Sequence, residues 1–297
     1  MRKNREKVAI MKVYYYAFTG HKYGLDRMKR ASVVVKKLKE NGIETMLLVS
    51  DFRAGLVARD FGVSESITIE GIQDIDAVAE IGDSIIIDSP EDDHGRLVKY
   101  CSDFKSVFRF AEHAEDKSIH GEIMLQINAT DDESISSLIV DDIYFQEHKK
   151  EERTLFFLGD SDAGKVILNH KDFFKDLEME LLLGNYFYVK YENELNKIFT
   201  ILHEADEYTD LICSSSRVVT ASFQTALEAT VAQAEVIFID VGNLTKEQRE
   251  LLILLKVILI INFNIDDYQH ALLKNVSMVS NRIERNETII TKIINRV

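Results

Sequence analysis

Short apolar runs rich in β-branched residues alternate with segments of helical periodicity in the first half of the chain. Helical periodicity between the early runs predicts helices over Met28–Leu38, Arg53–Phe61 and Gly95–Tyr100. Strands that alternate with helices form parallel sheets, so the pattern predicts an α/β fold. The predicted strands are Val13–Ala17, Met46–Val49, Ser66–Ile69, Ile85–Ile87, Val107–Phe110 and Ile123–Ile127.

The second half repeats this pattern after a charged stretch. Asp141–Arg153 has little apolar periodicity and is the best candidate for a linker. We therefore expect two Rossmann-like domains, residues 1–148 and 149–297, that face each other across a cleft. The last segment, Glu287–Ile294, is predicted to be a helix that can pack back across this cleft. The predicted strands of the second half are Leu155–Leu158, Tyr186–Val189, Phe199–Leu202, Val218–Ala221, Val236–Ile239 and Val257–Ile261.

The composition is that of a folded protein. Of the 297 residues, 46% are hydrophobic and 29% are charged. The longest apolar run, Leu251–Phe263, is interrupted by polar residues and too short to span a bilayer. The N-terminus lacks the apolar core of a signal peptide. Cys101 and Cys213 lie far apart without metal-ligand spacing, which is typical of a reducing compartment. We expect a cytoplasmic protein with no metal site and no cofactor.

The net charge of −14 is unevenly distributed. Residues 1–30 carry nine basic and two acidic residues, a charge of +7, which leaves −21 for the rest. A general nucleic-acid-binding protein needs a broad basic face, so the balance argues against that class. The basic start is interpreted as a solvated terminus, with peripheral contact to an anionic membrane as the alternative.

The stretch Val218–Ala229 is the most informative part of the sequence. A β-branched run leads through Ser222 and Gln224 into a predicted helix that carries Glu228, and the apolar run Ala234–Asp240 follows. In nucleotide-binding sheets the ligand lies at such a junction, where a helix begins at the carboxyl end of a strand. The Glu228 carboxylate can there hold ribose hydroxyls. Phe223 is interpreted as core, with the wall of a pocket as the alternative.

Five segments together resemble the GT-B superfamily. They are Tyr23–Arg30, Ile85–Ser89, Leu155–Asp162, Ser222–Glu228 and Lys246–Arg249. Within the superfamily, their order is similar to that of the UDP-sugar hydrolases of pseudaminic-acid synthesis and of spore-coat-polysaccharide biosynthesis proteins. The resemblance covers nearly the whole chain but is weak residue by residue, and residues that are essential for chemistry and for holding phosphate are altered at three of these segments.

The resemblance implies a site for a UDP-sugar or a related nucleotide sugar. Arg27 stands where the family has its catalytic histidine, and an arginine does not shuttle protons near neutral pH. The family's hydrolysis is therefore not expected here. Asp88, at the end of a strand, is the candidate base, and His21 would serve only if its loop folds back. The implied binding residues are Gly24, Arg27, Arg30, Gly159, Ser161, Ser222, Gln224, Thr225, Glu228 and Gln248.

Three functions are open at this point. The sequence favours a nucleotide-sugar-binding protein of cell-surface glycan biosynthesis, with glycosyl transfer as its chemistry if it is an enzyme. The second is a non-catalytic, degenerate family member that acts as a scaffold or pairs with a glycan-biosynthesis protein. The third is a P-loop phosphotransferase, because Gly159–Lys165 fits the spacing of that loop. Val166 stands, however, where that loop needs a Ser or Thr to bind magnesium.

Overall fold

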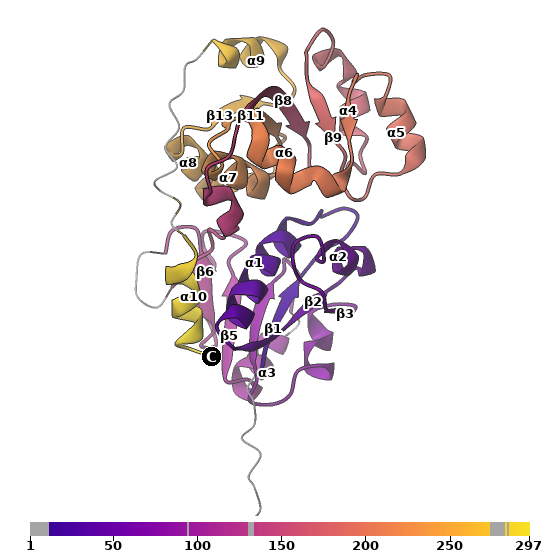
Figure 1. Cartoon of the computed structure of the whole chain (residues 1–297). Coiled ribbons are helices and arrows are strands. Elements are labelled where there is room, and N and C mark those ends of the chain that lie inside the picture. Colours follow the sequence, from indigo (N-terminus) through magenta and orange to yellow (C-terminus); the bar gives the residue numbers. More distant parts are fainter. Residues whose placement is uncertain (1–11, 94, 130–133, 274–282, 284) are drawn as a thin grey trace, which may run out of the picture.

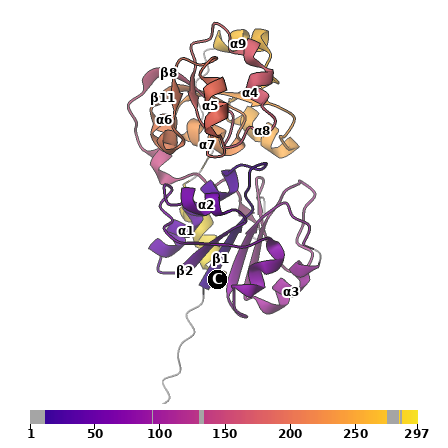
Figure 2. The same ribbon diagram turned by 90° about the vertical axis from the view of Figure 1, so that its right-hand side faces the viewer.

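A computed structural model describes residues 12–93, 95–129, 134–273, 283 and 285–297 (Figure 1). Two parallel β-sheets, each covered by helices, lie one above the other. The predicted fold class, α/β with two Rossmann-like sheets, is confirmed. Figure 2 shows the two halves in the same stacked arrangement from the side.

The first sheet has the strand order β3-β2-β1-β4-β5-β6-β7, and all its strands are parallel. In β1, Tyr14 and Tyr16 pack on one face of the sheet, and Tyr15 packs on the other. Burial on both faces is typical of a parallel sheet between helices. The strands are β1 (Lys12–Ala17), β2 (Glu44–Val49), β3 (Ser66–Thr68), β4 (Ser84–Asp88), β5 (Ser106–Phe110), β6 (Ile123–Gln126) and β7 (Ile135–Ser136). The helices are α1 (Asp26–Glu40), α2 (Phe52–Val57), η1 (Ile72–Ala77) and α3 (Arg96–Asp103).

The second sheet has the order β10-β9-β8-β11-β12-β13, again all parallel. Numbered from its own first strand, this is the order 3-2-1-4-5-6 of a Rossmann fold. The strands are β8 (Glu151–Phe157), β9 (Glu180–Leu182), β10 (Leu202–His203), β11 (Ser215–Thr220), β12 (Glu235–Asp240) and β13 (Ile258–Ile261). The helices are α4 (Val166–Asn169), η3 (Lys171–Phe173), α5 (Val189–Leu195), η4 (Ala205–Glu207), α6 (Tyr208–Ser214), α7 (Phe223–Val231), α8 (Lys246–Leu254) and α9 (Ile265–Leu272).

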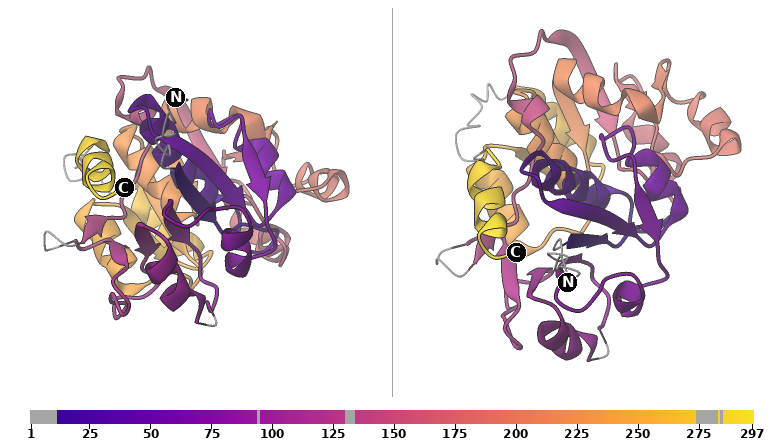
Figure 3. Two further views of the ribbon diagram at one scale, coloured as in Figure 1. Left: turned by 90° about the horizontal axis from the view of Figure 1, so that it is seen from below. Right: turned by 60° about the horizontal axis from the view of Figure 1, so that its bottom comes forward.

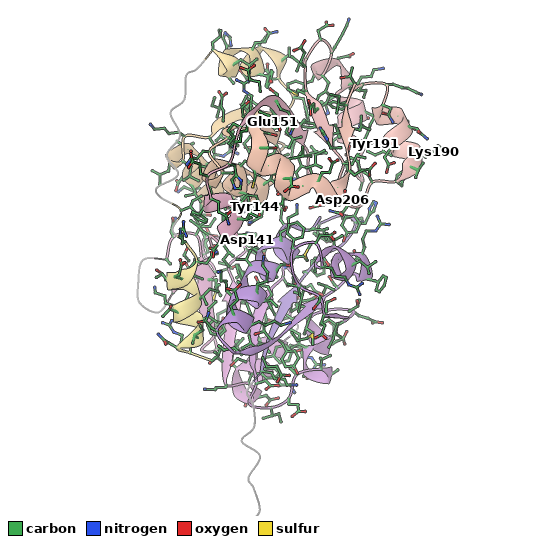
Figure 4. All side chains as sticks on the ribbon, in the orientation of Figure 1. Asp141, Tyr144, Glu151, Lys190, Tyr191 and Asp206 are labelled. Atoms are coloured by element: carbon green, nitrogen blue, oxygen red, sulfur yellow. The ribbon has the colours of Figure 1, made fainter. Side chains whose placement is uncertain are left out.

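Two segments tie the halves together. The short helix η2 (Asp142–Phe145) lies between the two sheets, where Figure 4 labels Asp141 and Tyr144. Asp141 pairs with Lys36 of α1, and Tyr144 is buried in the core of the second half. The last helix, α10 (Glu287–Ile294), packs its isoleucines into the core of the first half, so the chain ends there (Figure 3). We keep the division between residues 148 and 149 as a proposal.

Two strand predictions in the second half differ from the structure. The predicted strand Tyr186–Val189 is wrong, because this stretch is a turn that leads into α5. Its aromatic residues are buried for another reason: Tyr186 packs into the core of the first half and Phe187 into that of the second. Phe199 lies just after the turn that ends α5, outside any strand, and the strand there is Leu202–His203.

Two short strands are absent from the sequence pattern, and the linker is shorter than predicted. The two edge-region strands β7 and β9 are only two and three residues long, too short to show alternation. The expected linker Asp141–Arg153 contains η2, and β8 already begins at Glu151. The ends of these strands are set by backbone hydrogen bonds to the adjacent strand, and the amino-acid sequence does not show where those bonds stop.

In the part of the chain that the structure describes, no helix has both the length and the apolar character needed to cross a bilayer. Most of the basic N-terminal stretch that raised the question of membrane contact, residues 1–11, lies outside the described residues.

Candidate functional site

A cleft of about 380 Å³ lies between the two halves. Its walls come from the loop after β1, the end of β5, and the loops after β8, β11 and β12. The carboxyl ends of the parallel strands in both sheets therefore point into it. Ligands of open α/β sheets bind at this edge, and the volume lies within the range of about 300–1,000 Å³ typical of small-molecule pockets.

Most of the predicted binding residues line this cleft, but not all. Phe223 also lines it while packing against the core of the second half, so it has both of the roles considered for it. Thr225, Glu228, His21 and Asp88 are not among the lining residues. The predicted residues that do line the cleft are Gly24, Arg27, Arg30, Gly159, Ser161, Ser222, Gln224 and Gln248.

Ser222 fixes the junction between β11 and α7. It is the N-cap of α7, because its Oγ accepts a hydrogen bond from the backbone N–H of Thr225 at 3.1 Å. The same hydroxyl lies 2.9 Å from both carboxylate oxygens of Asp26, the first residue of α1. The beginning of α7 is thereby tied to the other half of the molecule. Asp26 is a site residue that was not predicted from the sequence.

Glu228 is buried beside the cleft and has only 2% of its surface exposed. The hydroxyl of Tyr208 donates to its Oε2 at 2.5 Å, and Nε2 of Gln224 donates to its Oε1 at 2.8 Å. Burial raises the pKa of Glu228 to about 7, although the Lys29 charge and these two hydrogen bonds favour the ionised form. Both carboxylate oxygens already have partners within the protein in this arrangement.

Lys29 of α1 reaches into the second half next to Glu228. Its Nζ lies 2.8 Å from Oδ2 of Asp160 and 3.8 Å from the centre of the Tyr208 ring. Burial lowers the pKa of Lys29, but Asp160, Asp26 and Glu228 outweigh this effect and hold the pKa above its ordinary value. Lys29 is therefore charged at neutral pH. A buried ion pair thus links the two halves directly behind the cleft.

Asp88 is fully buried at the end of β4 and forms ion pairs with two arginines. Arg30 forms a bidentate pair with its carboxylate, with Nε 2.5 Å from Oδ2, and the hydroxyl of Tyr15 donates to the same oxygen at 3.0 Å. Arg27 lies with Nε 3.4 Å from Asp88 and Nη2 2.7 Å from Glu112. Both guanidinium groups line the cleft but are already paired with carboxylates. This arrangement makes Asp88 a partner of the arginines rather than a group exposed to a ligand.

His21 lies on the surface, outside the cleft. It lines a separate groove with Asp51, Arg53 and Tyr186, and its ring centre is 5.8 Å from that of Tyr186. Its carbonyl accepts a hydrogen bond from the hydroxyl of Ser161. The loop therefore does not fold back to place the imidazole where the family histidine is expected.

Comparison with solved structures shows which fold this is. The UDP-GlcNAc 2-epimerase of Methanocaldococcus jannaschii, in complex with UDP-GlcNAc and UDP, is similar with a TM-score of 0.59 and 9% identity, over 96% of this chain and 99% of that one. S. aureus MnaA, in a structure with UDP, has a TM-score of 0.59 and 13% identity, over 88% of this chain and 87% of that one. The spinosyn rhamnosyltransferase SpnG, complexed with spinosyn aglycone, has a TM-score of 0.57 and 10% identity, over 96% of this chain and 97% of that one.

The chain has the GT-B fold. At these identities the similarity establishes the GT-B architecture alone. No family model matches the chain, and no curated protein matches it in sequence.

The P-loop-like segment of this GT-B chain holds its own carboxylate. The backbone N–H groups of Val166 and Ile167 donate to Asp162 at 2.6 and 3.1 Å. Lys165 pairs with Glu194 and does not line the cleft. The donors that a P-loop offers to phosphate are thus used internally. Within the described residues, no group of three or more His, Cys, Asp or Glu side chains is placed to hold a metal ion.

Gly184 is expected to be essential for the loop that carries Gly159 and Asp160. A Cβ at this position would lie 2.6 Å from the carbonyl oxygens of both residues, and backbone atoms cannot move away as a flexible side chain can. We expect Gly184→Ala to lower the free energy of unfolding by about 1–3 kcal/mol, the usual cost of overpacking. Urea denaturation checks this.

Gly164→Ala is the matched control. A Cβ there would lie 3.6 Å from Cγ2 of Val166, an ordinary contact. The control variant should unfold like the wild type. Equal stabilities of the two variants would mean that the loop after β8 adapts to a side chain at Gly184.

Proposed function

We propose that this chain binds a nucleotide sugar in the cleft between its two halves. The observation that carries the proposal is the lining of the cleft by predicted ligand-binding residues from both sheets, including Gly24, Ser161, Ser222 and Gln248. GT-B proteins of similar structure include complexes with UDP-GlcNAc and UDP, which supports the same ligand class here. A role in cell-surface glycan biosynthesis, including pseudaminic-acid synthesis, belongs to this proposal.

Hydrolysis by the mechanism of the resembling hydrolases is not part of the proposal. Arg27 stands in the position of their histidine, and its guanidinium group is paired with Glu112 and Asp88. If the protein is an enzyme, glycosyl transfer fits better than hydrolysis. In that reaction a carboxylate, in place of the missing histidine, can accept the proton of the acceptor hydroxyl. Asp26 and Glu112 are partly exposed carboxylates of this cleft, whereas Asp160 and Asp240 are buried and paired with Lys29 and Arg249.

Titration with UDP, UDP-GlcNAc and other UDP sugars tests the proposal. A ligand at 100 times its dissociation constant should stabilise the protein by about 2.7 kcal/mol, which thermal denaturation detects. Ser161→Ala and Gln248→Ala should each weaken binding roughly tenfold, the value of one good hydrogen bond to a charged ligand.

Lys165→Ala is the matched control and should leave the affinity unchanged, because this side chain lies outside the cleft. Release of UDP from UDP-GlcNAc, with and without added acceptor saccharides, then separates a transferase from a protein that only binds. If none of the nucleotides shifts the melting temperature, the proposal is wrong.

A second candidate function is that of a non-catalytic scaffold that pairs with an active glycan-biosynthesis enzyme. The burial of Glu228 favours the scaffold, because the carboxylate proposed to hold the ribose accepts hydrogen bonds from Tyr208 and Gln224 instead. Both candidates predict a stable GT-B domain pair, but only the first predicts nucleotide binding. The same titration therefore decides between them.

A further inference from the structure

The groove that His21 lines is a second cavity, of about 390 Å³, apart from the cleft. Asp51 and Arg53 line it at the beginning of α2, and the three aromatic residues Tyr186–Tyr188 line it from the loop between β9 and α5. Both halves therefore contribute to it. Like the cleft, the groove lies where parallel strands end, here β1, β2 and β9, and ligands of open α/β sheets bind at this edge.

The two charged side chains of the groove have opposite signs. The Asp51 carboxylate accepts hydrogen bonds from the hydroxyl of Tyr186 and, at 3.1 Å, from the backbone N–H of Arg53. Nη1 of Arg53 donates to the carbonyl of Asn185 at 2.6 Å, and no carboxylate among the described residues forms an ion pair with this exposed guanidinium group. A guanidinium group has several N–H donors, so most of those of Arg53 remain for a ligand.

Aromatic rings form the rest of the groove. Tyr188 is 50% exposed, although Tyr186 and Phe187 beside it are buried. The centre of the Tyr186 ring lies 5.8 Å from that of His21 and 5.7 Å from Cζ of Arg53. The face of an aromatic ring is the negative side of its quadrupole, so it attracts the polarised C–H groups on the flat face of a pyranose. An exposed tyrosine beside hydrogen-bonding groups is therefore a surface on which a sugar ring can stack.

We propose that this groove binds an uncharged saccharide. A hydroxyl group both donates and accepts hydrogen bonds, so neighbouring hydroxyls of one sugar can bond to Arg53 and to Asp51 together. A charged ligand would bring a like charge close to one of these two residues. An apolar ligand would leave the polar atoms of both without partners.

The groove and the cleft share a wall, the turn Gly20–Gly24. Backbone hydrogen bonds close this turn. Lys22, Tyr23 and Gly24 line the cleft, whereas His21 lines the groove. A saccharide in the groove would thus lie beside a nucleotide sugar in the cleft, where glycosyl transfer needs its acceptor. This acceptor role rests on the proposed function, whereas saccharide binding in the groove does not.

Fluorescence of the variant Tyr188→Trp tests the inference. The chain has no tryptophan of its own, so the emission reports on the groove alone. The probes are cellobiose and N,N′-diacetylchitobiose, two uncharged disaccharides, and at least one of them should change the emission with a saturable curve. Their charged counterparts are cellobiuronic acid, which has a carboxylate, and chitobiose, which has two ammonium groups. The counterpart of a disaccharide that binds should bind roughly tenfold more weakly, because like charges repel.

Calorimetry with the disaccharide that binds then compares the wild type with two variants. Tyr188→Ala should weaken binding about fivefold through the loss of stacking, and Arg53→Met about tenfold through the loss of hydrogen bonds. Both residues are exposed, so both variants should fold, which circular dichroism checks. Val189→Ala and Arg59→Met are the matched controls, since these residues are also exposed but lie outside the groove. Their affinity should equal that of the wild type.

The outcomes separate this site from the nucleotide-sugar site. Tyr188→Ala and Arg53→Met should keep the wild-type affinity for UDP, because neither residue lines the cleft. If UDP binds and neither uncharged disaccharide does, the groove proposal is wrong and the proposed function stands. If a disaccharide binds and UDP does not, the groove proposal stands and the proposed function is wrong.

Two further results would overturn the groove proposal. Disaccharide binding that is weakened by Ser161→Ala but not by Tyr188→Ala would place the sugar in the cleft. Tighter binding of a charged counterpart than of the uncharged disaccharide would contradict the balance of Asp51 and Arg53. If neither UDP nor any disaccharide binds, both proposals are wrong.

Discussion

Replacing Asp88 by asparagine is expected to lower the free energy of unfolding by about 3 kcal/mol. The carboxylate is fully buried and binds Arg30 through both oxygens, with Tyr15 and Arg27 as further partners. Removing one member of a buried ion pair costs about 3–5 kcal/mol, because the other charge stays buried without compensation. We use the lower end of this range, since 17% of the Arg30 side chain is exposed to solvent. Urea denaturation at neutral pH measures the loss.

The control is Asp103→Asn, which removes one of the two carboxylates that pair with the exposed Lys99 of α3, the other being Asp76. Pairs in contact with solvent contribute little, so this variant should unfold like the wild type. If Asp88→Asn is as stable as the wild type but loses UDP-sugar turnover, Asp88 acts as the base that the sequence analysis proposed. A large loss of stability in Asp88→Asn, with the control unchanged, identifies it as the carboxylate that holds the two arginines.

The fold could be predicted from the sequence because parallel strands are buried on both faces. Runs such as Ile85–Ile87 and Val236–Ile239 are continuous apolar segments, and each proved to be part of a strand in the order of the chain. The prediction failed at Tyr186–Val189, where apolar residues are buried without a strand. These residues are buried by contacts between the halves, and a one-dimensional pattern does not distinguish such contacts from a sheet.

The site was predicted less completely than the fold. Positions at the ends of strands, such as Gly159 and Ser222, line the cleft because topology alone brings the carboxyl ends of both sheets together. The partners of Glu228 were missed. Lys29 follows the buried Met28 on a helix with many charged residues, where a lysine is usually solvated. Tyr208 is the first residue of α6, and nothing in the neighbouring sequence distinguishes it from an exposed tyrosine. Their burial results from how the halves pack, which no local sequence signal records.

A second large effect is expected from the pH dependence of Glu228. Its pKa is raised from about 4.5 to about 7, chiefly by burial. The native state therefore binds this proton more tightly than the unfolded chain, and the resulting stability is fully present below pH 4.5. It is lost as the pH rises from 4.5 to 7, by about 3 kcal/mol in total. Glu228→Gln cannot ionise and should not show this loss.

The measurement is urea denaturation of the wild type and Glu228→Gln at a series of pH values from 5 to 8. Other carboxylates titrate in both proteins, so the difference between the two curves isolates Glu228. The variant should gain on the wild type as the pH rises, with most of the change complete near pH 7. In Tyr208→Phe, Glu228 loses a hydrogen bond that favours its ionised form, so the change should move to higher pH.

Parallel curves for the wild type and Glu228→Gln would contradict this expectation. They would mean that Glu228 ionises in the native protein as it does in the unfolded chain, so that the Lys29 charge and the hydrogen bonds from Tyr208 and Gln224 fully offset the effect of burial on its pKa. The pH series therefore measures the balance between burial and these favourable interactions before any ligand is added, independently of which nucleotide sugar the protein binds.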